Sequence, residues 1–236
     1  MHQLKRLRSS IDFLALKNDQ YPMFASREDA GRRLGHYLLE KDIRPDVVLG
    51  LPRGGVIVAA EVANILQVPL DVVVVRKIGH PLHREFAVGA LAEPDVVVLD
   101  DSVVGHNPLV RMQLKHVIAE EQERLQRYGA TFHRDGLPDL TNKAVLLVDD
   151  GLATGATTEA AVEAVKRKGA RMVIVAAPVA STNAVERLSR VADEVRILIV
   201  DPDFDAVGRY YESFSQTTDE EVLNLLHARV PNPHSA

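Results

Sequence analysis

Two adjacent acids, Asp149 and Asp150, stand between an apolar run and a loop of small and hydroxyl-bearing residues. The apolar residues before them, 145–148, show no polar alternation, which is typical of a parallel strand covered on both faces. The loop after them, residues 151–158, contains two glycines and three threonines. Glycines let a backbone approach a ligand closely, and amides at the start of the following helix favour an anion. The pattern predicts a phosphate-binding turn beside two carboxylates.

The two carboxylates need a partner other than phosphate, because like charges would repel each other. Ribose hydroxyls and a divalent cation both suit such a pair. An ordinary strand-to-helix turn with a Gly-Thr cap is the plain alternative for the loop, but such a turn has no use for two acids. Ligands of open α/β sheets bind at the carboxyl ends of the strands, where Asp149 and Asp150 are expected to lie. We therefore predict a phosphosugar site.

A second small-residue loop, Arg53-Gly54-Gly55, follows an expected strand at residues 47–51 and precedes an expected helix. Its free amides would lie at the same edge of the sheet and suit pyrophosphate. Taken alone, this motif is typical of a plain turn. Its position ahead of the acidic motif is what favours a binding role.

Two cations, Arg76 and Lys77, end the next expected strand. At that edge of the sheet they would be costly unless an anion or a carboxylate compensated them. A surface basic pair is the alternative, and it stays open above all for Lys77.

The stretch from residue 144 to 158, Ala-Val-Leu-Leu-Val-Asp-Asp-Gly-Leu-Ala-Thr-Gly-Ala-Thr-Thr, closely resembles the signature of the type I phosphoribosyltransferases. The resemblance implies that Asp149 and Asp150 hold the ribose hydroxyls of 5-phosphoribosyl-1-pyrophosphate (PRPP). It also implies that they bind Mg²⁺, directly or through those hydroxyls and water. The 5′-phosphate would be bound by Ala153, Thr154, Gly155, Ala156, Thr157 and Thr158. Enzymes of the hypoxanthine type carry an acid at the position of Ala153, whereas adenine and uracil types resemble this chain better there. A general base is therefore not expected from the middle of the loop.

Further motifs resemble a group of predicted phosphoribosyltransferases whose substrates are not generally established. These motifs are Leu-Pro-Arg-Gly-Gly, Val-Arg-Lys-Ile-Gly, Glu-Phe-Ala-Val-Gly-Ala and Val-Gly-Arg-Tyr-Tyr-Glu-Ser-Phe-Ser-Gln, and they extend the resemblance over about residues 24–226. The resemblance implies a pyrophosphate site made of Arg53, Gly54, Gly55, Arg76 and Lys77. It implies a catalytic set made of Asp149, Asp150, Arg53 and Arg76. A Mg²⁺ cofactor and a homodimer are also implied.

Alternating strands and helices predict an α/β fold with a mainly parallel twisted sheet flanked by helices. Strands are expected at residues 47–51, 70–76, 96–99, 144–148, 171–175 and 194–198. Helices are expected at residues 27–40, 56–66, 108–128, 157–168, 183–190 and 218–226. We divide the chain into an N-terminal extension at 1–25, a phosphoribosyltransferase core at 26–200, and a small C-terminal hood segment with a final helix at 201–236.

Aromatic residues gather in the segment 201–216, which holds Phe204, Tyr210, Tyr211 and Phe214. Such rings can stack on a planar base, and the resemblance implies a variable hood that does so. We predict a base pocket formed by Val179, Phe204 and Tyr210. Packing of a small subdomain core is the alternative for these residues.

Residues 78–93 are expected to form a loop or hairpin over the site, with His80 and His83 facing solvent. Charges on the later turns of the 108–128 helix are expected to form a solvated face supported by opposite charges three or four residues apart. A mobile flap at residues 128–142 is a further hypothesis, since members of the family often place such a flap before the signature.

The 236 residues carry a net charge of −5 and contain no cysteine. An acidic chain is a poor partner for nucleic acid, and the lack of thiols excludes disulfides and thiolate catalysis. No apolar run approaches the ~20 residues that a membrane span needs. Residues 1–10 are basic but lack the apolar core of a signal peptide, so we expect a loosely docked tail rather than a transit segment. We expect a cytoplasmic protein.

The combined expectation is a Mg²⁺-dependent pentosyltransferase that moves the 5-phosphoribosyl group of PRPP to a nitrogen of a small planar base and releases pyrophosphate. A PRPP-binding sensor without transferase activity is the alternative from another class. A phosphorylation receiver domain also opens with a strand and two acids, but a Gly-Thr loop directly after the acids does not suit it. The acceptor base stays open, because flat rings of several kinds stack on aromatic residues with similar ease.

Overall fold

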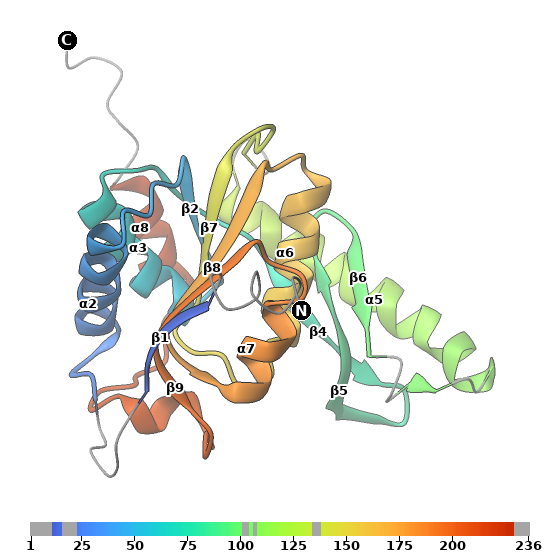
Figure 1. The fold of residues 1–236 in the computed structure, drawn as a ribbon. Helices are drawn as coiled ribbons and strands as arrows, with labels where there is room; N and C mark the ends of the chain where they lie inside the picture. The colour runs from blue at the N-terminus through green and yellow to red at the C-terminus, as the bar shows by residue number, and fades with distance from the viewer. Residues whose placement is uncertain (1–10, 16–22, 101–103, 106–107, 134–137, 229–236) are drawn as a thin grey trace, which may run out of the picture.

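The computed structural model describes residues 11–15, 23–100, 104–105, 108–133 and 138–228. Its centre is a six-stranded sheet in which all neighbouring strands are parallel (Figure 1). In spatial order the strands are β1 (Ile11–Ala15), β9 (Glu194–Asp201), β8 (Met172–Ser181), β7 (Ala144–Val148), β2 (Val47–Gly50) and β3 (Leu70–Val72). The predicted parallel α/β sheet is confirmed.

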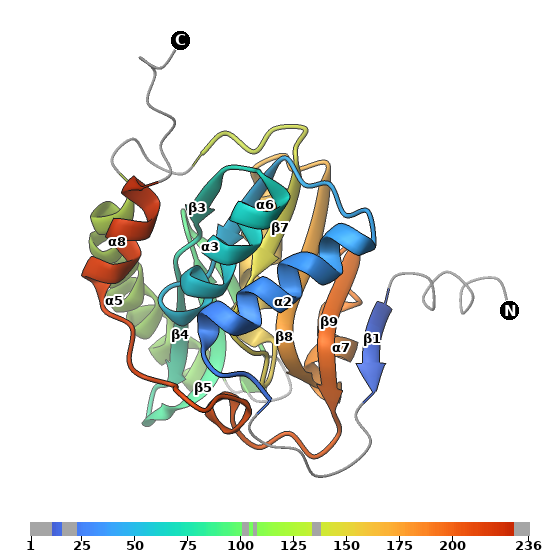
Figure 2. The same ribbon diagram turned by 90° about the vertical axis from the view of Figure 1, so that its left-hand side faces the viewer.

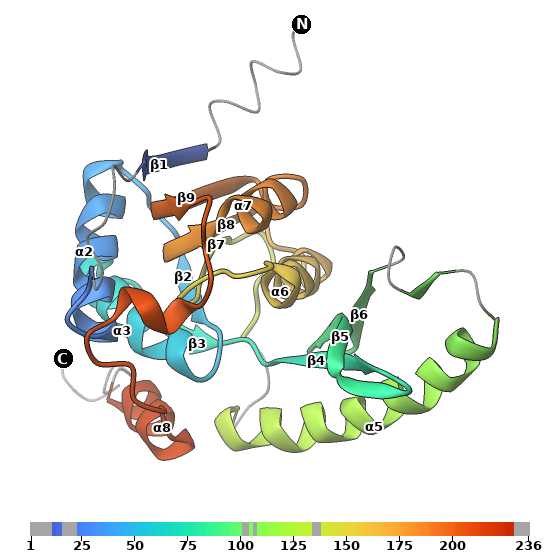
Figure 3. The ribbon, with the colours of Figure 1, turned by 90° about the horizontal axis from the view of Figure 1, so that it is seen from below.

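Helices cover both faces of this sheet, as Figures 1 and 3 show. One face carries α2 (Arg27–Glu40) and α3 (Gly54–Leu66), and the other carries α6 (Ala156–Arg167) and α7 (Thr182–Leu188). Strand β7 is buried along its whole length. Leu146 packs into the core on the side of α2 and α3, and Leu147 packs into the core on the side of α6 and α7. Burial on two faces explains why the apolar run before the acids shows no polar alternation.

A second, antiparallel sheet lies beside the first. It consists of β4 (Val75–His80), β5 (His83–Ala92) and β6 (Val96–Leu99). Helix α6 packs on one face of this small sheet through Ala160 and Ala164, and α5 (Pro108–Phe132) packs on the other face through Leu114 and Leu125. Helix α6 therefore separates the two sheets, while α5 lies on the outside (Figure 3).

The strand predicted at residues 70–76 is wrong as a single element, because the chain leaves the parallel sheet in its middle. Val73 still donates its N–H to the Gly50 carbonyl at 3.2 Å, but Val74 donates to the Glu93 carboxylate at 2.6 Å. Strand β4 then starts the antiparallel sheet, and the loop or hairpin expected over residues 78–93 is the β4–β5 hairpin. The strand predicted at 96–99 has the right bounds but belongs to this second sheet.

The C-terminal segment divides into two parts. Residues 201–217, which include the 3-10 turn η1 (Val207–Tyr210), run along the ligand edge of the parallel sheet, where Phe24 forms a bridge to Tyr211. Helix α8 (Asp219–His227) begins with a capping box between Thr218 and Glu221. It packs beside α3 and α5, as Figure 2 shows.

Most other predicted bounds agree closely with the structure. The helix at 27–40 and the strand at 144–148 have the predicted limits, and α3 starts two residues earlier than predicted, at Gly54. Strand β8 runs on to Ser181, because its second half pairs with β9. Strand β1 lies within the segment assigned to an N-terminal extension, whereas residues 1–10 fall outside the described residues. No helix in the described part of the chain combines the length and apolar character that crossing a bilayer requires.

Candidate active site

The two predicted loops leave the parallel sheet side by side. Strands β2 and β7 are neighbours with Gly50 opposite Val148, and Leu51 donates its N–H to the Val148 carbonyl at 3.0 Å. The Arg53–Gly54–Gly55 loop therefore lies against the acids. A Cβ at Gly54 would clash with the Asp150 carboxylate, and one at Gly55 would lie 2.8 Å from Asp149 Oδ1. Both positions require glycine for this close approach.

The acidic pair is short of compensating charge. Asp150 donates its backbone N–H to Asp149 Oδ1 at 2.9 Å. Burial raises the pKa of Asp149 well above its usual value, and the charge of Asp150 raises it further. Burial also raises the pKa of Asp150, although Arg27 opposes that effect. A partly buried acidic pair of this kind favours hydroxyl donors or a cation as its ligand.

Arg27 is a site residue that the sequence did not predict. Its Nε donates to Asp150 Oδ2 at 2.7 Å, and the two side chains are only 11% and 15% exposed. The same guanidinium donates to the Ser215 carbonyl at 2.7 Å and lies 3.8 Å from the centre of the Phe214 ring. A signal was present, because Arg27 follows the N-cap Ser26 of α2, and a cation in the first turn of a helix opposes the helix dipole. Such a cation calls for an anionic partner.

Backbone hydrogen bonds hold the predicted phosphate loop against strand β8. Leu152 donates its N–H to the Val179 carbonyl, Ser181 donates its N–H to the Leu152 carbonyl, and both bonds are 2.9 Å long. Ser181 Oγ also donates to the Ala153 carbonyl at 2.5 Å. Gly155, at φ +72°, then caps α6 without a side-chain hydrogen bond. At the first turn of α6, Ala156 donates its N–H to Thr154 Oγ1 only in a long contact of 3.4 Å, so this amide stays available to an anion.

The threonines of this loop do not all face the same way. Thr154 is exposed and Thr157 is partly exposed, so their hydroxyls can reach a ligand. Thr158 is buried within the core, and only its backbone could contribute to a phosphate site. Thr158 lies in the helical turn that starts at Ala156, on the inward face of α6.

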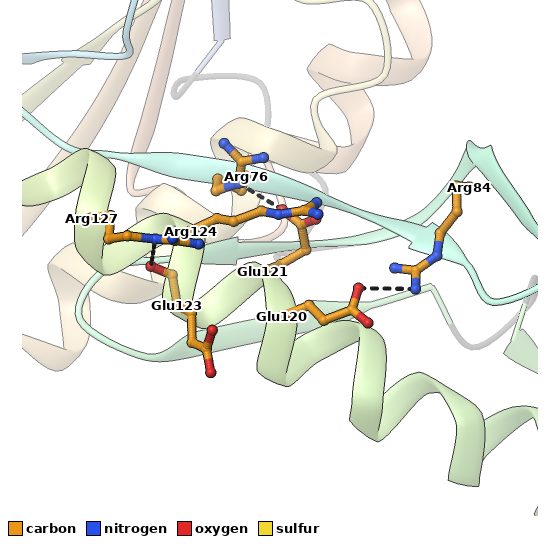
Figure 4. A network of polar contacts seen from close by, with 7 residues as sticks. All are labelled: Arg76, Arg84, Glu120, Glu121, Glu123, Arg124 and Arg127. Atoms are coloured by element: carbon orange, nitrogen blue, oxygen red, sulfur yellow. Dashed lines mark hydrogen bonds and ion pairs between the residues drawn. The ribbon is translucent and has the colours of Figure 1, made fainter.

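The two predicted cations of β4 have different surroundings, since successive side chains of a strand point to opposite faces. Lys77 lies close enough to Asp149 for its charge to lower the pKa of that carboxyl. Arg76 instead binds Glu121 of α5, with Nε 2.6 Å from Oε2 (Figure 4). Glu121 also binds Arg124 at 2.6 Å. The structure therefore brings Lys77, and not Arg76, to the acids.

Arg53 lies at the rim of the site beside α8. Its NH1 is 3.8 Å from Asp219 Oδ1, and the hydroxyl of Tyr128 donates to the same oxygen at 2.8 Å. The peptide bond between Pro52 and Arg53 is cis. Because its side chain is 37% exposed, Arg53 can turn toward an anion at the neighbouring glycines.

The predicted base pocket falls mostly in the core. Tyr210 is 1% exposed, stacks on Phe204 and donates its hydroxyl to Asp201 at 2.6 Å, and Val179 is fully buried. Backbone pairing of residues 23–25 with 210–213 turns Tyr210 inward. Phe214 is the exposed ring instead. An open cavity of about 360 Å³ lies there, lined by Arg27, Arg53, Gly54, Phe214, Ser215, Gln216 and Thr217.

The side chains available as ligands limit which metal ion could bind at the site. Among the described residues, no three His, Cys, Asp or Glu side chains come together as a metal site. Asp149 and Asp150 supply carboxylate oxygens alone. Such a pair fits Mg²⁺, which is commonly held by one or two carboxylates together with the phosphates of a substrate.

A parallel sheet whose carboxyl edge carries two acids, glycine-lined loops and two helix N-termini is suited to a phosphorylated sugar. A family model described as the phosphoribosyl transferase domain matches residues 25–211. The chain belongs to this family of pentosyltransferases.

Similar proteins agree with this assignment. The chain is 45% identical over 206 residues to a protein of Mycobacterium tuberculosis, found in strains H37Rv and CDC 1551, whose name assigns it provisionally as a phosphoribosyl transferase. The match covers 86% of this chain and 46% of that protein, so the chain spans about half the length of these curated relatives. The crystal structure of TT1426 from Thermus thermophilus is 43% identical and superposes with a TM-score of 0.72. That superposition covers 86% of this chain and 97% of TT1426.

Proposed function

We propose that this protein transfers the 5-phosphoribosyl group of PRPP to a nitrogen of a small planar acceptor and releases pyrophosphate. The observation that carries the proposal is the packing of Gly54 and Gly55 directly against Asp150 and Asp149. This packing puts a glycine loop suited to pyrophosphate next to carboxylates suited to ribose hydroxyls. The start of α6, suited to the 5′-phosphate, follows the acids within the same loop.

Each part of the site has a task in this reaction. The carboxylates accept hydrogen bonds from the ribose hydroxyls, and the amides and threonines of residues 153–157 hold the 5′-phosphate. The bond between the anomeric carbon and pyrophosphate breaks, its electron pair leaves with pyrophosphate, and a bond to the acceptor nitrogen forms. Arg53, Lys77 and the amides of Gly54 and Gly55 stabilise the charge that collects on the leaving group.

Magnesium dependence is part of the proposal. Asp149 and Asp150 would hold Mg²⁺ directly or through ribose hydroxyls and water. The ion would supply neutralisation of pyrophosphate charge. Arg76 is left out of the pyrophosphate site, because Glu121 binds it on the other face of β4.

The acceptor is proposed to enter the cavity beside Phe214. The exposed part of the Phe214 ring offers apolar contact to a flat acceptor, and the backbone groups of the 215–217 segment offer polar contacts. Entry at this point would bring the acceptor between the hood segment and Gly54, next to the proposed sugar site.

The experiment is pyrophosphate release from PRPP and Mg²⁺ across purine, pyrimidine and nicotinate-like acceptors, with Asp150→Asn as control. Release that depends on one acceptor and is lost in the variant identifies the transferase and its substrate. PRPP binding without release from any acceptor would favour a PRPP-binding sensor instead. Engagement of Arg76 by Glu121, away from the leaving group, is the observation that favours this second candidate.

A cytoplasmic homodimer completes the proposal. Several large apolar side chains are exposed on the β4–β5 hairpin and on the first turns of α5, namely Leu82, Phe86, Leu109 and Met112. Exposed apolar residues gathered in one region are typical of an interface. Light scattering after size exclusion tests the dimer, and a monomer at micromolar concentration contradicts it.

A further inference from the structure

Arg27 touches three parts of the site that come from distant parts of the chain. Its Nε holds Asp150 of the acidic pair at 2.7 Å. A Cβ on Gly54 would lie 2.6 Å from the same Nε, so the guanidinium also packs on the glycine loop. Its NH1 binds the Ser215 carbonyl, and its plane lies over the Phe214 ring. A single rigid group therefore joins the sugar site to the wall of the acceptor cavity.

A ligand at Asp150 competes with this guanidinium for one carboxylate. Arg27 occupies Oδ2, the oxygen that also faces Gly54. A divalent cation at the acids would repel the guanidinium, and ribose hydroxyls would compete for the same lone pairs. Because the guanidinium is planar and its donors are fixed relative to one another, any shift at Asp150 is passed on to Ser215 and Phe214.

The other contact between the hood and the acids is of a different kind. Tyr211 donates its hydroxyl to the backbone carbonyl of Asp150 at 2.6 Å, and its ring is buried between Phe24 and Phe214. A ligand on the Asp150 carboxylate does not compete for that carbonyl. Tyr211 therefore anchors the hood, and Arg27 is the contact that a ligand can change.

We propose that Arg27 is a positioning residue that couples occupancy of the Asp149–Asp150 site to the position of residues 213–217. The inference rests on the proposed function, because the ligand at the acids is taken to be the ribose of PRPP with its divalent cation. Binding of PRPP thereby reshapes the cavity that receives the acceptor.

The test uses a single fluorescent label on the hood. The chain contains no cysteine, so Gln216→Cys gives one labelling site beside Phe214 and leaves the Arg27 contacts in place. We expect a saturable change in emission when PRPP and Mg²⁺ are titrated into the full chain. The same label on Lys168→Cys, at the far end of α6, should not respond.

The discriminating variant is Arg27→Lys in the labelled protein. Lysine keeps a positive charge beside Asp150 but lacks the planar fork that reaches Ser215 and Phe214 together. At saturating PRPP, with the saturating concentration set for each variant by calorimetry, we expect the emission change to fall by about fivefold or more. Arg33→Lys is the matched control on the same helix, where Arg33 pairs with Asp29 at 2.9 Å, and it should keep the full emission change.

Two outcomes overturn the inference. A full emission change in Arg27→Lys at saturating PRPP means that the coupling does not pass through Arg27. PRPP binding without any emission change in the unsubstituted background means that the hood does not respond, although the proposed function stands. Absence of PRPP binding in the unlabelled protein defeats the proposed function, and the inference falls with it.

Discussion

The ligand edge of the parallel sheet and an open groove between α5 and the β4–β5 hairpin both place carboxylates beside arginines, but the two regions pair these carboxylates differently. In the groove, Glu121 is only 9% exposed on its side chain and binds both Arg76 and Arg124, and Arg84 binds Glu120 (Figure 4). At the sheet edge, two adjacent and partly buried acids have one hydrogen-bonded cation among the described residues, Arg27, which binds Asp150 but not Asp149. We call the groove network balanced because each of these carboxylates is paired with an arginine, and the sheet edge unbalanced because Asp149 has no ion-pair partner among the described residues. A balanced network holds elements together, whereas an unbalanced one is suited to a ligand.

Asp150→Asn is the strongest test of the unbalanced side. We expect pyrophosphate release to fall on the order of a hundredfold or more, because the ribose loses an orienting carboxylate. The melting temperature should stay the same or rise, since burial raises the pKa of Asp150 and thus disfavours its charge in the folded state. Asp203→Asn, at an exposed position after β9, is the control. Near-normal release would remove Asp150 from the mechanism.

Gly54→Ala tests the close approach of the two loops. The added methyl group would overlap the Asp150 carboxylate and crowd Arg27, so the loop must shift. We expect PRPP affinity to fall by about 30-fold while the fold is retained, because small displacements of binding groups are costly. Calorimetry with PRPP and Mg²⁺, together with a circular dichroism spectrum, measures both. Unchanged affinity would show that the loop takes no part in binding.

Glu121→Gln tests the balanced side. The change leaves Arg76 and Arg124 without their shared anion, and we expect the free energy of unfolding to fall by about 1.5 kcal/mol, a value kept small because both arginines are partly exposed. Pyrophosphate release should change by less than about threefold, since a balanced network is structural. Urea denaturation and the release assay measure the two effects. A loss of release comparable to that of Asp150→Asn would return Arg76 to the catalytic machinery.

A second balanced contact should make stability depend on pH. His133, 5% exposed, lies at the end of α5 with Nε2 2.9 Å from Glu93 Oε1 and Nδ1 3.6 Å from Asp71. Burial lowers the pKa of His133, but the hydrogen bond and charge of Glu93 and the charge of Asp71 together raise it above 6.5. A raised pKa in the folded state means that this stabilisation is complete below about pH 6.5 and is lost as pH rises through the folded pKa.

The measurement is the free energy of unfolding by urea between pH 6 and pH 9. We expect a decrease on the order of 1 kcal/mol across this window that disappears in His133→Gln. The matched control, His36→Gln on the exposed face of α2, should keep the decrease. The pKa of Asp71, raised by burial, adds a change of the same sign at lower pH. A decrease that survives in His133→Gln would assign it to another group.

Local patterns predicted the elements that build the sheet edge. The unbroken apolar run of β7 is typical of a strand buried on two faces, and this placed the acids and the Gly-Thr loop after it at the ligand edge. The same argument predicted the position of the Arg53 loop, because β2 ends at the same edge of the sheet.

Side-chain directions after an irregularity could not be predicted in this way. Whether Arg76 or Lys77 faces the acids depends on where the chain leaves the parallel sheet, and that point is set by the distant Glu93 carboxylate. The inward turn of Tyr210 depends on pairing with residues 23–25, far away in sequence. Arg27 carried a local signal, because it is a cation in the first turn of a helix. Its partner Asp150, however, lies 123 residues away in sequence.

Helix α6 lies between the two sheets, and alanine methyl groups set how closely the antiparallel sheet packs against it. Ala160 and Ala164 are the residues through which it meets Ala90 and Ala92 of the antiparallel sheet, and none of the four is more than 1% exposed. A larger side chain at either helix position would push the antiparallel sheet outward. Lys77 belongs to the antiparallel sheet, and Asp149 directly follows β7 of the parallel one. The alanine side chains between the sheets therefore set the distance between a cation and an acid of the site.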